Sequence, residues 1–247
     1  VRGDLNVDLA QVRRHALATA PDVLPPDGPA ETVELGGEKY KVQWLARETF
    51  GRPDWVNRWF VEGDSHVWTA QDRLCVRSSD PNRPNVATIW YRPELPADAI
   101  VRFRAAAVEP AEKNAANLNL FLHAREVDGA PVRFGRSGQY KEYHEAPNYI
   151  VTFVGGHRPG WSRVRRDPGF NLLHEADVRS EVGKVYRIAV TVQGGRLRYY
   201  VDGRKLHDVK DPKPLGGGRF AFRTWSTNAW WADVEFGRIV PADRPVK

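Results

Sequence analysis

The chain has 247 residues, 41% of them hydrophobic and 28% charged, so it can bury a core and is too apolar to be disordered. Lys and Arg number 37 against 31 Asp and Glu, a formal net charge of +6 that favours an anionic partner. No apolar run reaches the roughly 18 residues of a membrane-spanning helix, so the sequence predicts a globular protein without a membrane partner.

The first 30 residues predict a separate N-terminal segment. Apolar residues recur at helical spacing over Asp8–Ala20, and Pro21 ends that pattern. The following stretch, PDVLPPDGPA, is dense in Pro, Gly and Asp and is typical of a linker. We therefore expect a short helix and linker over residues 1–30 and one larger domain over residues 31–247.

From Thr32 onward the hydrophobic pattern has the period of two that is typical of β-strands. Near the end of the chain, Gly194-Gly195 and Asp202-Gly203 separate three apolar runs, and both pairs suit tight hairpin turns. A three-stranded meander is expected there. A dozen or more strands at this spacing predict an all-β fold, a two-sheet antiparallel β-sandwich.

The segment RSGQYKEYHEA carries the first candidate catalytic residues. On an extended strand, Tyr140, Glu142 and His144 project from one face, while Lys141 and Tyr143 point to the other. A phenol, a carboxylate and an imidazole on one wall suit proton transfer or the binding of sugar hydroxyls. The alternative is a strand whose polar face meets only water, and which face lines a groove stays open at this stage.

A second candidate surface follows an apolar run of leucines. Asn117, Asn119, Phe121 and His123 alternate with those leucines, so a strand would present them on one side. Amides and imidazole pair with hydroxyls, and an aromatic ring stacks on a sugar ring. An ordinary solvated face explains each residue equally well when it is taken singly.

Arginines mark two further segments. Arg165 and Arg166 precede the turn Asp167-Pro168-Gly169, and guanidinium groups grip carboxylates or sulfates in a bidentate manner. In RFAFRTW, two phenylalanines would fill the core, which turns Arg223 and Trp225 to the opposite side. A charged loop tip and a Trp-rich core strand are the simpler interpretations.

Several standard sites are absent from the sequence. It contains no GxGxxG, GxxxxGK[ST], HExxH, GxSxG or CxxC motif, which removes the dinucleotide, P-loop, zincin, serine-hydrolase and zinc-ribbon classes. We predict neither a cofactor nor a catalytic metal, and leave open a structural Ca²⁺ assembled from distant loops. The single Cys75 cannot form an internal disulfide. The localisation stays open: periplasmic or secreted if a signal peptide has been removed, cytoplasmic otherwise.

One motif carries a resemblance to a known family. The pattern R-x-G-x-Y-x-E-Y-H comprises Arg136, Gly138, Tyr140, Glu142, Tyr143 and His144. It resembles the YesU-like bacterial proteins, a family of unknown function with a concanavalin A-like jelly-roll fold, over roughly Trp55 to Ile239. The resemblance implies a carbohydrate context, in particular the degradation of plant pectins, and adds Arg136 and Tyr143 to the candidate binding residues.

The leading hypothesis is a carbohydrate-active enzyme that cleaves an acidic polysaccharide or oligosaccharide by β-elimination. Arg223 or Arg165 would neutralise the uronate carboxylate, which acidifies the C5 proton and stabilises the charge that forms. Tyr140 would act as the base or as the acid to the leaving oxygen, with His144 as its partner.

Two alternatives belong to other classes. Glu142 could serve a glycoside hydrolase if Glu62 or Asp64 supplied the second carboxylate. A carbohydrate-binding module without catalysis would need only the basic groove and exposed aromatic residues. Nucleic-acid binding ranks last, because the arginines are scattered among acids and no recognised binding motif occurs.

Overall fold

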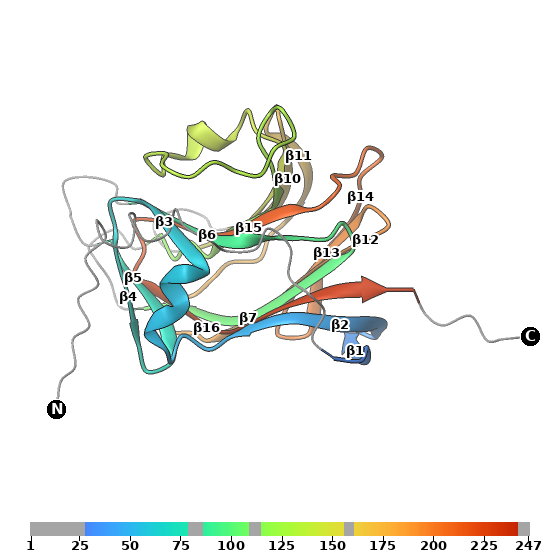
Figure 1. The fold of residues 1–247 in the computed structure, drawn as a ribbon, viewed down its shortest axis with the longest axis horizontal. Helices are drawn as coiled ribbons and strands as arrows, with labels where there is room; N and C mark the ends of the chain where they lie inside the picture. Colours follow the sequence, from blue (N-terminus) through green and yellow to red (C-terminus); the bar gives the residue numbers. More distant parts are fainter. Residues whose placement is uncertain (1–27, 79–85, 109–114, 156–160, 242–247) are drawn as a thin grey trace, which may run out of the picture.

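Two antiparallel sheets pack face to face in the computed structural model, which describes residues 28–78, 86–108, 115–155 and 161–241 (Figure 1). The all-β sandwich expected from the sequence is confirmed. The helix expected over Asp8–Ala20 lies outside the described residues, and the boundary at residue 30 stays a prediction. Within the described ranges, no helix has the length and apolar character to cross a membrane.

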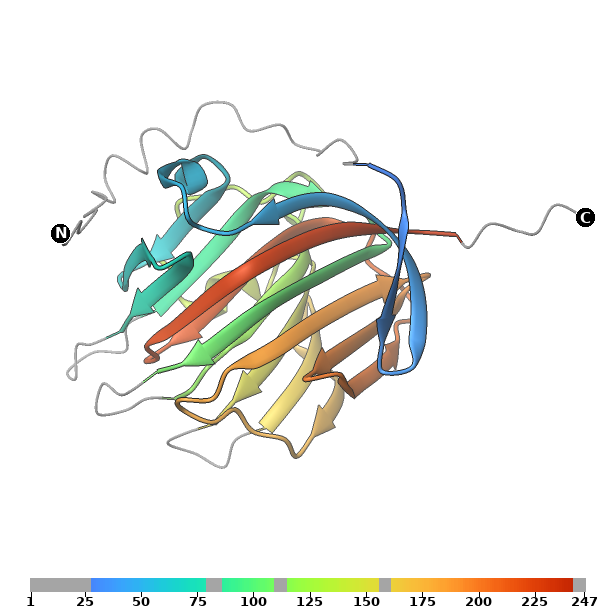
Figure 2. The same cartoon turned by 90° about the horizontal axis from the view of Figure 1, so that it is seen from below.

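The first sheet has nine strands, and Figure 2 shows it face on, with the last strand of the chain inserted between β2 and β7. Seven strands follow one another in space: β1 (Glu31–Leu35), β2 (Glu38–Glu48), β16 (Ala229–Val240), β7 (Ala99–Ala107), β12 (Tyr186–Gln193), β13 (Arg196–Val201) and β14 (Arg204–Lys210). The hairpin of β4 (His66–Ala70) and β5 (Arg73–Arg77) joins this sheet at β16.

The second sheet has seven strands. In spatial order they are β11 (Asn171–Ala176), β10 (Trp161–Asp167), β9 (Asn148–Val154), β8 (Asn119–Ala124), β15 (Gly218–Trp225), β6 (Val86–Leu95) and β3 (Trp59–Gly63). Two short 3₁₀ helices complete the described elements: η1 (Pro53–Asn57) and η2 (Tyr140–Tyr143).

The meander of β12, β13 and β14 is confirmed. Gly194 and Gly195 link β12 to β13 and both have positive φ angles, which glycine adopts without the steric cost of a Cβ atom. Asp202-Gly203 links β13 to β14. The turn residues therefore fix this part of the nine-stranded sheet.

The main core lies between the two sheets and follows strict alternation along the strands. On β15, Phe220 and Phe222 face the core, and Phe222 stacks on Trp59 with ring centroids 5.5 Å apart. The intervening side chains of β15, including Arg223, project from the outer face of the seven-stranded sheet. This outer face also carries the pocket described below.

A long loop, residues 125–147, covers part of that outer face and carries η2 (Figure 1). Beneath it lies a second, smaller cluster of buried side chains, with Phe121 from β8, Trp90 from β6 and Tyr143 from η2. This loop leaves the rest of the outer face uncovered. The loop therefore divides one sheet face into a covered half and an open half.

Candidate functional site

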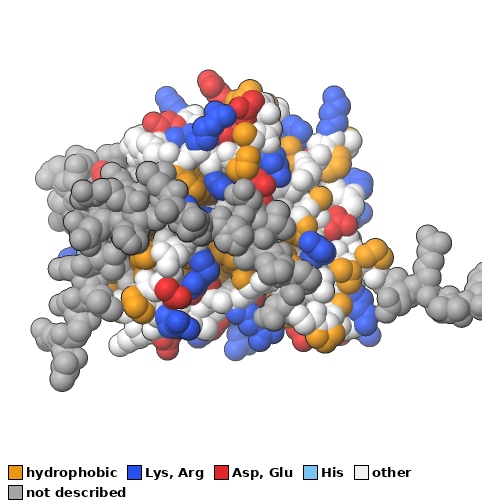
Figure 3. All heavy atoms as spheres, viewed as in Figure 1, with side chains coloured by type: hydrophobic (Ala, Val, Ile, Leu, Met, Phe, Trp, Pro, Cys, Tyr) orange, Lys and Arg blue, Asp and Glu red, His pale blue; other side chains and the backbone are white. Residues whose placement is uncertain are grey.

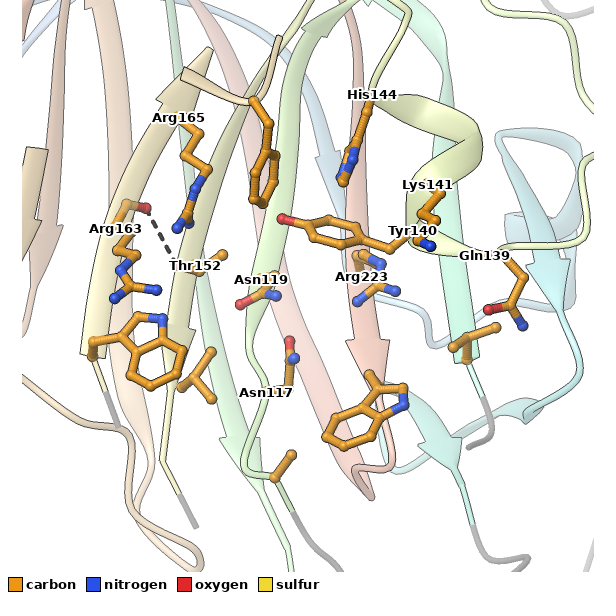
Figure 4. A pocket seen from close by; sticks show the side chains of 16 residues that line it. Asn117, Asn119, Gln139, Tyr140, Lys141, His144, Thr152, Arg163, Arg165 and Arg223 are labelled. Carbon is orange, nitrogen blue, oxygen red and sulfur yellow. Dashed lines mark hydrogen bonds between the residues drawn. The ribbon is translucent and has the colours of Figure 1, made fainter. Parts of the chain in front are cut away.

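The open half of the outer face holds a pocket of about 840 Å³ (Figure 4). Its lining comprises Val86, Ala115, Asn117, Asn119, Gln139, Tyr140, Lys141, His144, Thr152, Val154, Trp161, Arg163, Arg165, Phe170, Arg223 and Trp225. Four adjacent strands, β10, β9, β8 and β15, supply most of its floor. Because alternate residues of each strand point outward, the floor forms rows that run across the sheet.

One row of the floor is polar. Arg223 on β15 lies opposite Asn119 on β8, and Thr152 on β9 lies opposite Arg163 on β10. Asn119 is fixed by the hydrogen bond that its Oδ1 accepts from the Phe153 amide, 3.1 Å away. The row therefore offers guanidinium, amide and hydroxyl groups to a ligand at fixed positions.

The next row is largely apolar and aromatic. Trp225 on β15 lies opposite Val86 on β6, and Trp161 on β10 lies opposite Val154 on β9. Three strand spacings separate β15 from β10, so the two tryptophans stand about 14 Å apart at opposite sides of the pocket. Each can stack on the apolar face of a sugar ring.

The wall at one end of the pocket consists of three rings. Tyr140 and His144 meet edge to face with centroids 4.5 Å apart, and His144 stacks on Phe170 at 4.3 Å. Figure 4 shows Tyr140 lying over Arg223, whose guanidinium carbon is 4.3 Å from the centre of the phenol ring. Two segments far apart in sequence, η2 and the β10–β11 turn, thus meet at this end.

The prediction of a strand over the Tyr140–His144 segment is wrong, because the structure has the 3₁₀ helix η2 there. The helical turn brings Tyr140 and His144, four residues apart, to the same side. Glu142 points away, where its carboxylate accepts hydrogen bonds from the Ser137 backbone N–H at 2.9 Å and from the Ser137 hydroxyl at 2.8 Å. Two of the three proposed catalytic side chains therefore share the pocket, and the carboxylate does not.

A buried carboxylate explains why this segment leaves the extended conformation. Glu62 on β3 accepts hydrogen bonds from the Tyr143 hydroxyl, the Trp90 indole and the Gly135 and Arg136 amides, at 2.7 to 2.9 Å. The three contacts with the loop, from Gly135, Arg136 and Tyr143, each span more than seventy residues of sequence, so no local pattern reports them. They fold the loop onto β3 and place η2 over the sheet.

A glycine makes this close approach feasible. Gly138 has φ of +84°, and a Cβ atom at this position would lie 2.7 Å from the Cα of Gly63 on β3. A larger residue would push the loop off the sheet. The glycine that the sequence motif contains therefore serves the backbone path of the loop.

The pocket carries an unbalanced charge. Its lining includes four cationic side chains, Lys141, Arg163, Arg165 and Arg223, and no acidic one among the described residues. Arg163 forms an ion pair with Glu175 on β11. In the described part of the chain, Arg165 and Arg223 form no ion pair with a carboxylate, although Arg223 is only 4% exposed.

Burial and these charges shift the titrations of the pocket. Burial raises the pKa of Tyr140 to about 12, against the opposing effect of Arg223 and Arg165, so the phenol keeps its proton at neutral pH. Burial, followed by the same two arginines, lowers the pKa of His144, which is therefore neutral at pH 7. Burial also lowers the pKa of Arg223, which still stays protonated.

Several polar atoms around the pocket are buried yet unpartnered within the described residues. They are the Asn117 Oδ1, the Tyr140 hydroxyl, the His144 Nε2 and the Arg223 Nε. Buried polar groups in native proteins almost always have hydrogen-bond partners. Their concentration at one cavity indicates groups that a bound molecule or solvent would satisfy.

The structure thus brings seven of the candidate residues to one pocket: Asn117, Asn119, Tyr140, His144, Arg165, Arg223 and Trp225. Five lie elsewhere. Glu142 is one of them, and Tyr143 is buried beneath the loop, with its hydroxyl bonded to Glu62. Of the two tyrosines of η2, Tyr140 therefore lines the pocket and Tyr143 does not.

The other three candidates take structural roles. Arg136 forms an ion pair with Glu126, and Arg166 forms one with Asp211. His123 has a positive φ of 56°, which breaks the alternation of β8 and turns the ring into the interior. Burial lowers its pKa to about 4.

The sequence interpretation missed several lining residues. Trp161 lies two residues before Arg163 and four before Arg165, so the period of a strand could have placed it on the same face. Phe170 lies in the turn between β10 and β11, and its ring contacts with His144 and Tyr140 identify it as a pocket residue. No periodic pattern reports such a residue.

Within the described ranges, no group of three or more His, Cys, Asp or Glu side chains lies close enough to hold a metal ion. A structural Ca²⁺ therefore stays a prediction. On the face of the molecule that Figure 3 shows, the Lys and Arg side chains of the described residues are scattered and interleaved with acidic side chains.

The sequence matches one family model, a domain of unknown function named DUF6250, over residues 82–234. The chain belongs to the DUF6250 family. No curated protein matches it. The YesU-like name suggested by the motif stays a prediction for this DUF6250 member.

Solved structures confirm the architecture. A Bacillus subtilis protein of unknown function with a galectin-like fold matches with a TM-score of 0.71 and 18% identity, covering 82% of this chain and all of that chain. The exoplasmic/lumenal domain of VIP36, bound to Ca²⁺ and Man3GlcNAc, matches at 0.59 and 15%, over 81% and 90% of the two chains. The carbohydrate-binding module CBM66 from Bacillus subtilis matches at 0.51 and 14%, over 72% and 93%. At these identities the likeness shows the fold, and the pocket must indicate the function.

Proposed function

We propose that this DUF6250 protein binds an acidic saccharide in the pocket on the outer face of the seven-stranded sheet. The observation that carries the proposal is the charge of the pocket: four cationic side chains line it and no acidic one does, within the described residues. A uronate carboxylate would supply the partner that Arg223 and Arg165 lack.

The rest of the lining suits a sugar ring. Asn117, Asn119 and Thr152 offer donors and acceptors to hydroxyl groups, and Trp161 and Trp225 offer flat apolar surfaces. Structures of the same fold include a carbohydrate-binding module and a lumenal domain bound to an oligosaccharide, which supports a saccharide as the ligand class.

Calorimetric titration tests the proposal. Oligosaccharides of galacturonate, glucuronate and the alginate uronates would be compared with neutral oligosaccharides of equal length. We expect at least one acidic series to bind, with its neutral counterpart at least tenfold weaker, because a charge-assisted hydrogen bond contributes about 1.5 kcal/mol or more. Equal affinities for the acidic and neutral series, or no binding of any of them, would overturn the proposal.

Arg223→Gln and Arg102→Gln are a matched pair for that titration. Arg102 lies on the nine-stranded sheet and pairs with Glu235, so its loss should leave saccharide affinity unchanged. Arg223→Gln should weaken the acidic ligand about 30-fold or more, since truncating one member of a buried charge pair costs at least 2 kcal/mol.

β-Elimination in the same pocket is a second candidate function, favoured by Tyr140 and His144 meeting above Arg223. His144 Nε2 would take the C5 proton, the C4–O bond would break as the C4=C5 double bond forms, and the Tyr140 hydroxyl would protonate the leaving oxygen. The neutral His144 and the protonated Tyr140 suit these two roles. Arg223 would stabilise the charge on the carboxylate.

Ultraviolet absorbance of the unsaturated product separates elimination from binding alone. Turnover that is lost in Tyr140→Phe, with saccharide affinity retained, would support elimination; tight binding without any absorbance would remove it. Hydrolysis by two carboxylates receives no support from the geometry. Glu142 points away, and Glu62 is fully buried beneath the loop.

A further inference from the structure

Two buried oxygen atoms lie unpartnered at the end of the pocket that Phe170 closes. They are the Asp167 Oδ2 and the Asn148 Oδ1. Their residues are opposite one another on neighbouring strands, Asp167 at the end of β10 and Asn148 at the start of β9. Both side chains are at most 1% exposed. Two acceptors without a donor between them need an explanation.

The hydrogen bonds of Asn148 fix which of its atoms is unpartnered. Its amide nitrogen donates to the Tyr143 carbonyl at 3.0 Å and to the Ala146 carbonyl at 2.7 Å. These two bonds use both N–H groups of the amide, and its oxygen is the atom without a partner among the described residues. These two acceptors set the orientation of the amide, and its Oδ1 is left without a donor.

Asp167 holds the opposite wall of the pocket. Its Oδ1 accepts a hydrogen bond of 2.6 Å from the Phe170 amide, and the Phe170 ring stacks on His144. Asn148 in turn holds the end of the segment that carries Tyr140 and His144. The pair Asn148 and Asp167 therefore ties together the two segments that meet at the three-ring wall.

We propose that Asp167 is a positioning residue that is protonated in the intact pocket, its Oδ2 hydroxyl donating to the Asn148 Oδ1. One proton satisfies both unpartnered atoms. When it is lost, a carboxylate faces an amide oxygen and the two walls separate. The expected consequence for ligand affinity rests on the proposed saccharide binding; the proton link itself does not.

The electrostatic surroundings agree with a retained proton. Burial raises the pKa of Asp167 to about 6, against the opposing effects of the Phe170 amide, the Asn148 side chain and Arg165. The charged and titratable groups that act on this carboxyl are Arg165 on its own strand and Tyr140 on η2. Ionised Asp167 would also offset the charge of Arg165, which weakens attraction for an anion.

Asp211 is a matched control, because it is buried to a similar degree and both of its oxygens have donors. It accepts hydrogen bonds from the Tyr149 hydroxyl at 2.7 Å, from Arg166 at 2.9 Å and from the Lys213 amide at 2.8 Å. At Asp167 one oxygen accepts from the Phe170 amide, and the other has no hydrogen-bond partner among the described residues.

Carboxyl-carbon NMR over a pH series tests the proton link without any ligand. The Asp167 resonance would be assigned by its absence in Asp167→Asn, and its midpoint is expected near pH 6. A midpoint at or below about 4, the value of an ordinary Asp, would overturn the proposal.

The Asp167→Asn variant mimics the protonated acid, since its amide can donate to Asn148 while its oxygen accepts from Phe170. Its melting temperature should match the wild type at about pH 4 and exceed it at about pH 7.5, because the stability that the proton gives the wild type falls as pH rises from about 4, the ordinary value of an Asp, to about 6. Asp211→Asn should melt lower at both. A variant that is destabilised at both pH values would contradict the proton link.

Saccharide affinity supplies the last readout. It should fall several-fold in the wild type from about pH 5 to about pH 7.5 and fall less in Asp167→Asn, in which His144 is left to titrate. Equal pH profiles in the two proteins would overturn the coupling to the pocket. A midpoint near 6 without any saccharide binding would support the proton link and overturn the proposed function.

Discussion

Two hollows of nearly equal size lie on the outer faces of the two sheets. The pocket on the seven-stranded sheet measures about 840 Å³, and a hollow on the nine-stranded sheet measures about 820 Å³. Their charges differ. The second is lined by Arg102, Arg104 and Arg187 together with Asp202, Asp233 and Glu235, three cations against three acids.

Pairing explains why only one of them resembles a binding site. Arg102 is bound to Glu235, and Arg104 to Asp233, so two of the three arginines that line the hollow on the nine-stranded sheet are paired within it. The pocket leaves Arg165 and Arg223 without a carboxylate in the described part of the chain. Volume alone does not distinguish the two faces, whereas unpaired buried charge does.

The largest effect is expected from a substitution that gives Arg223 a carboxylate partner, as Arg102 and Arg104 have on the nine-stranded sheet. Asn119→Asp would place a carboxylate directly across from Arg223 and keep the bond from the Phe153 amide. We expect the affinity for an acidic saccharide to fall about 100-fold, and the melting temperature to rise, as the buried guanidinium gains a partner. Titration calorimetry and thermal melting measure the two effects.

Asn119→Ala is the control for that prediction, because it removes the amide without adding charge and should weaken the acidic ligand less. An Asn119→Asp protein that binds the acidic ligand as tightly as the wild type would show that Arg223 does not hold its carboxylate.

Adjacent arginines on β10 sharpen the comparison further. Arg165 lines the pocket, while Arg166 points to the opposite side and pairs with Asp211. Arg165→Gln should weaken the acidic ligand about tenfold with little change in melting temperature. Arg166→Gln should lower the melting temperature and leave the affinity unchanged. Reversed results would place the binding site on the other side of the sheet.

Two tryptophans form a further matched pair, each with a guanidinium over its ring. Arg163 lies 4.2 Å from the centre of Trp161 in the pocket, and Arg102 lies 4.3 Å from the centre of Trp44 on the other sheet. Trp161→Ala should reduce affinity about fivefold, the size of one stacking contact. Trp44→Ala, by contrast, should lower the melting temperature alone, since Trp44 belongs to a buried cluster.

The smallest effect is expected where a charge is freed on the nine-stranded sheet. Asp233→Asn leaves Arg104 unpaired, but both side chains are about half exposed to solvent. An exposed ion pair contributes at most about 1 kcal/mol, so stability should change little. No acidic saccharide should bind there, which equilibrium titration of an Arg223→Gln/Asp233→Asn double variant would check.

The sequence predicted those parts of the site that depend on strand alternation. On β15 the alternation correctly separated Phe222, in the core, from Arg223 and Trp225, on the pocket side. It likewise placed Asn117 and Asn119 on one face. A period of two is a local property, so the residues themselves report it.

The rest of the site depends on contacts between distant residues. The Tyr140–His144 segment reads as a strand, yet it forms a 3₁₀ turn. Glu62, on another strand, holds it through the Tyr143 hydroxyl and the Gly135 and Arg136 amides of the preceding loop. The positive φ of His123 and the position of Phe170 likewise follow from tertiary packing. Local pattern cannot report an anchor that lies more than seventy residues away.

The separation of Phe222 from Arg223 by a single peptide bond has an evolutionary consequence. Outward positions on the pocket floor can change while the inward positions, and with them the sandwich, stay the same. Ligand specificity and folding therefore depend on different, alternating residues of the same strand. This chain and the Bacillus subtilis protein with a galectin-like fold share the architecture at 18% identity.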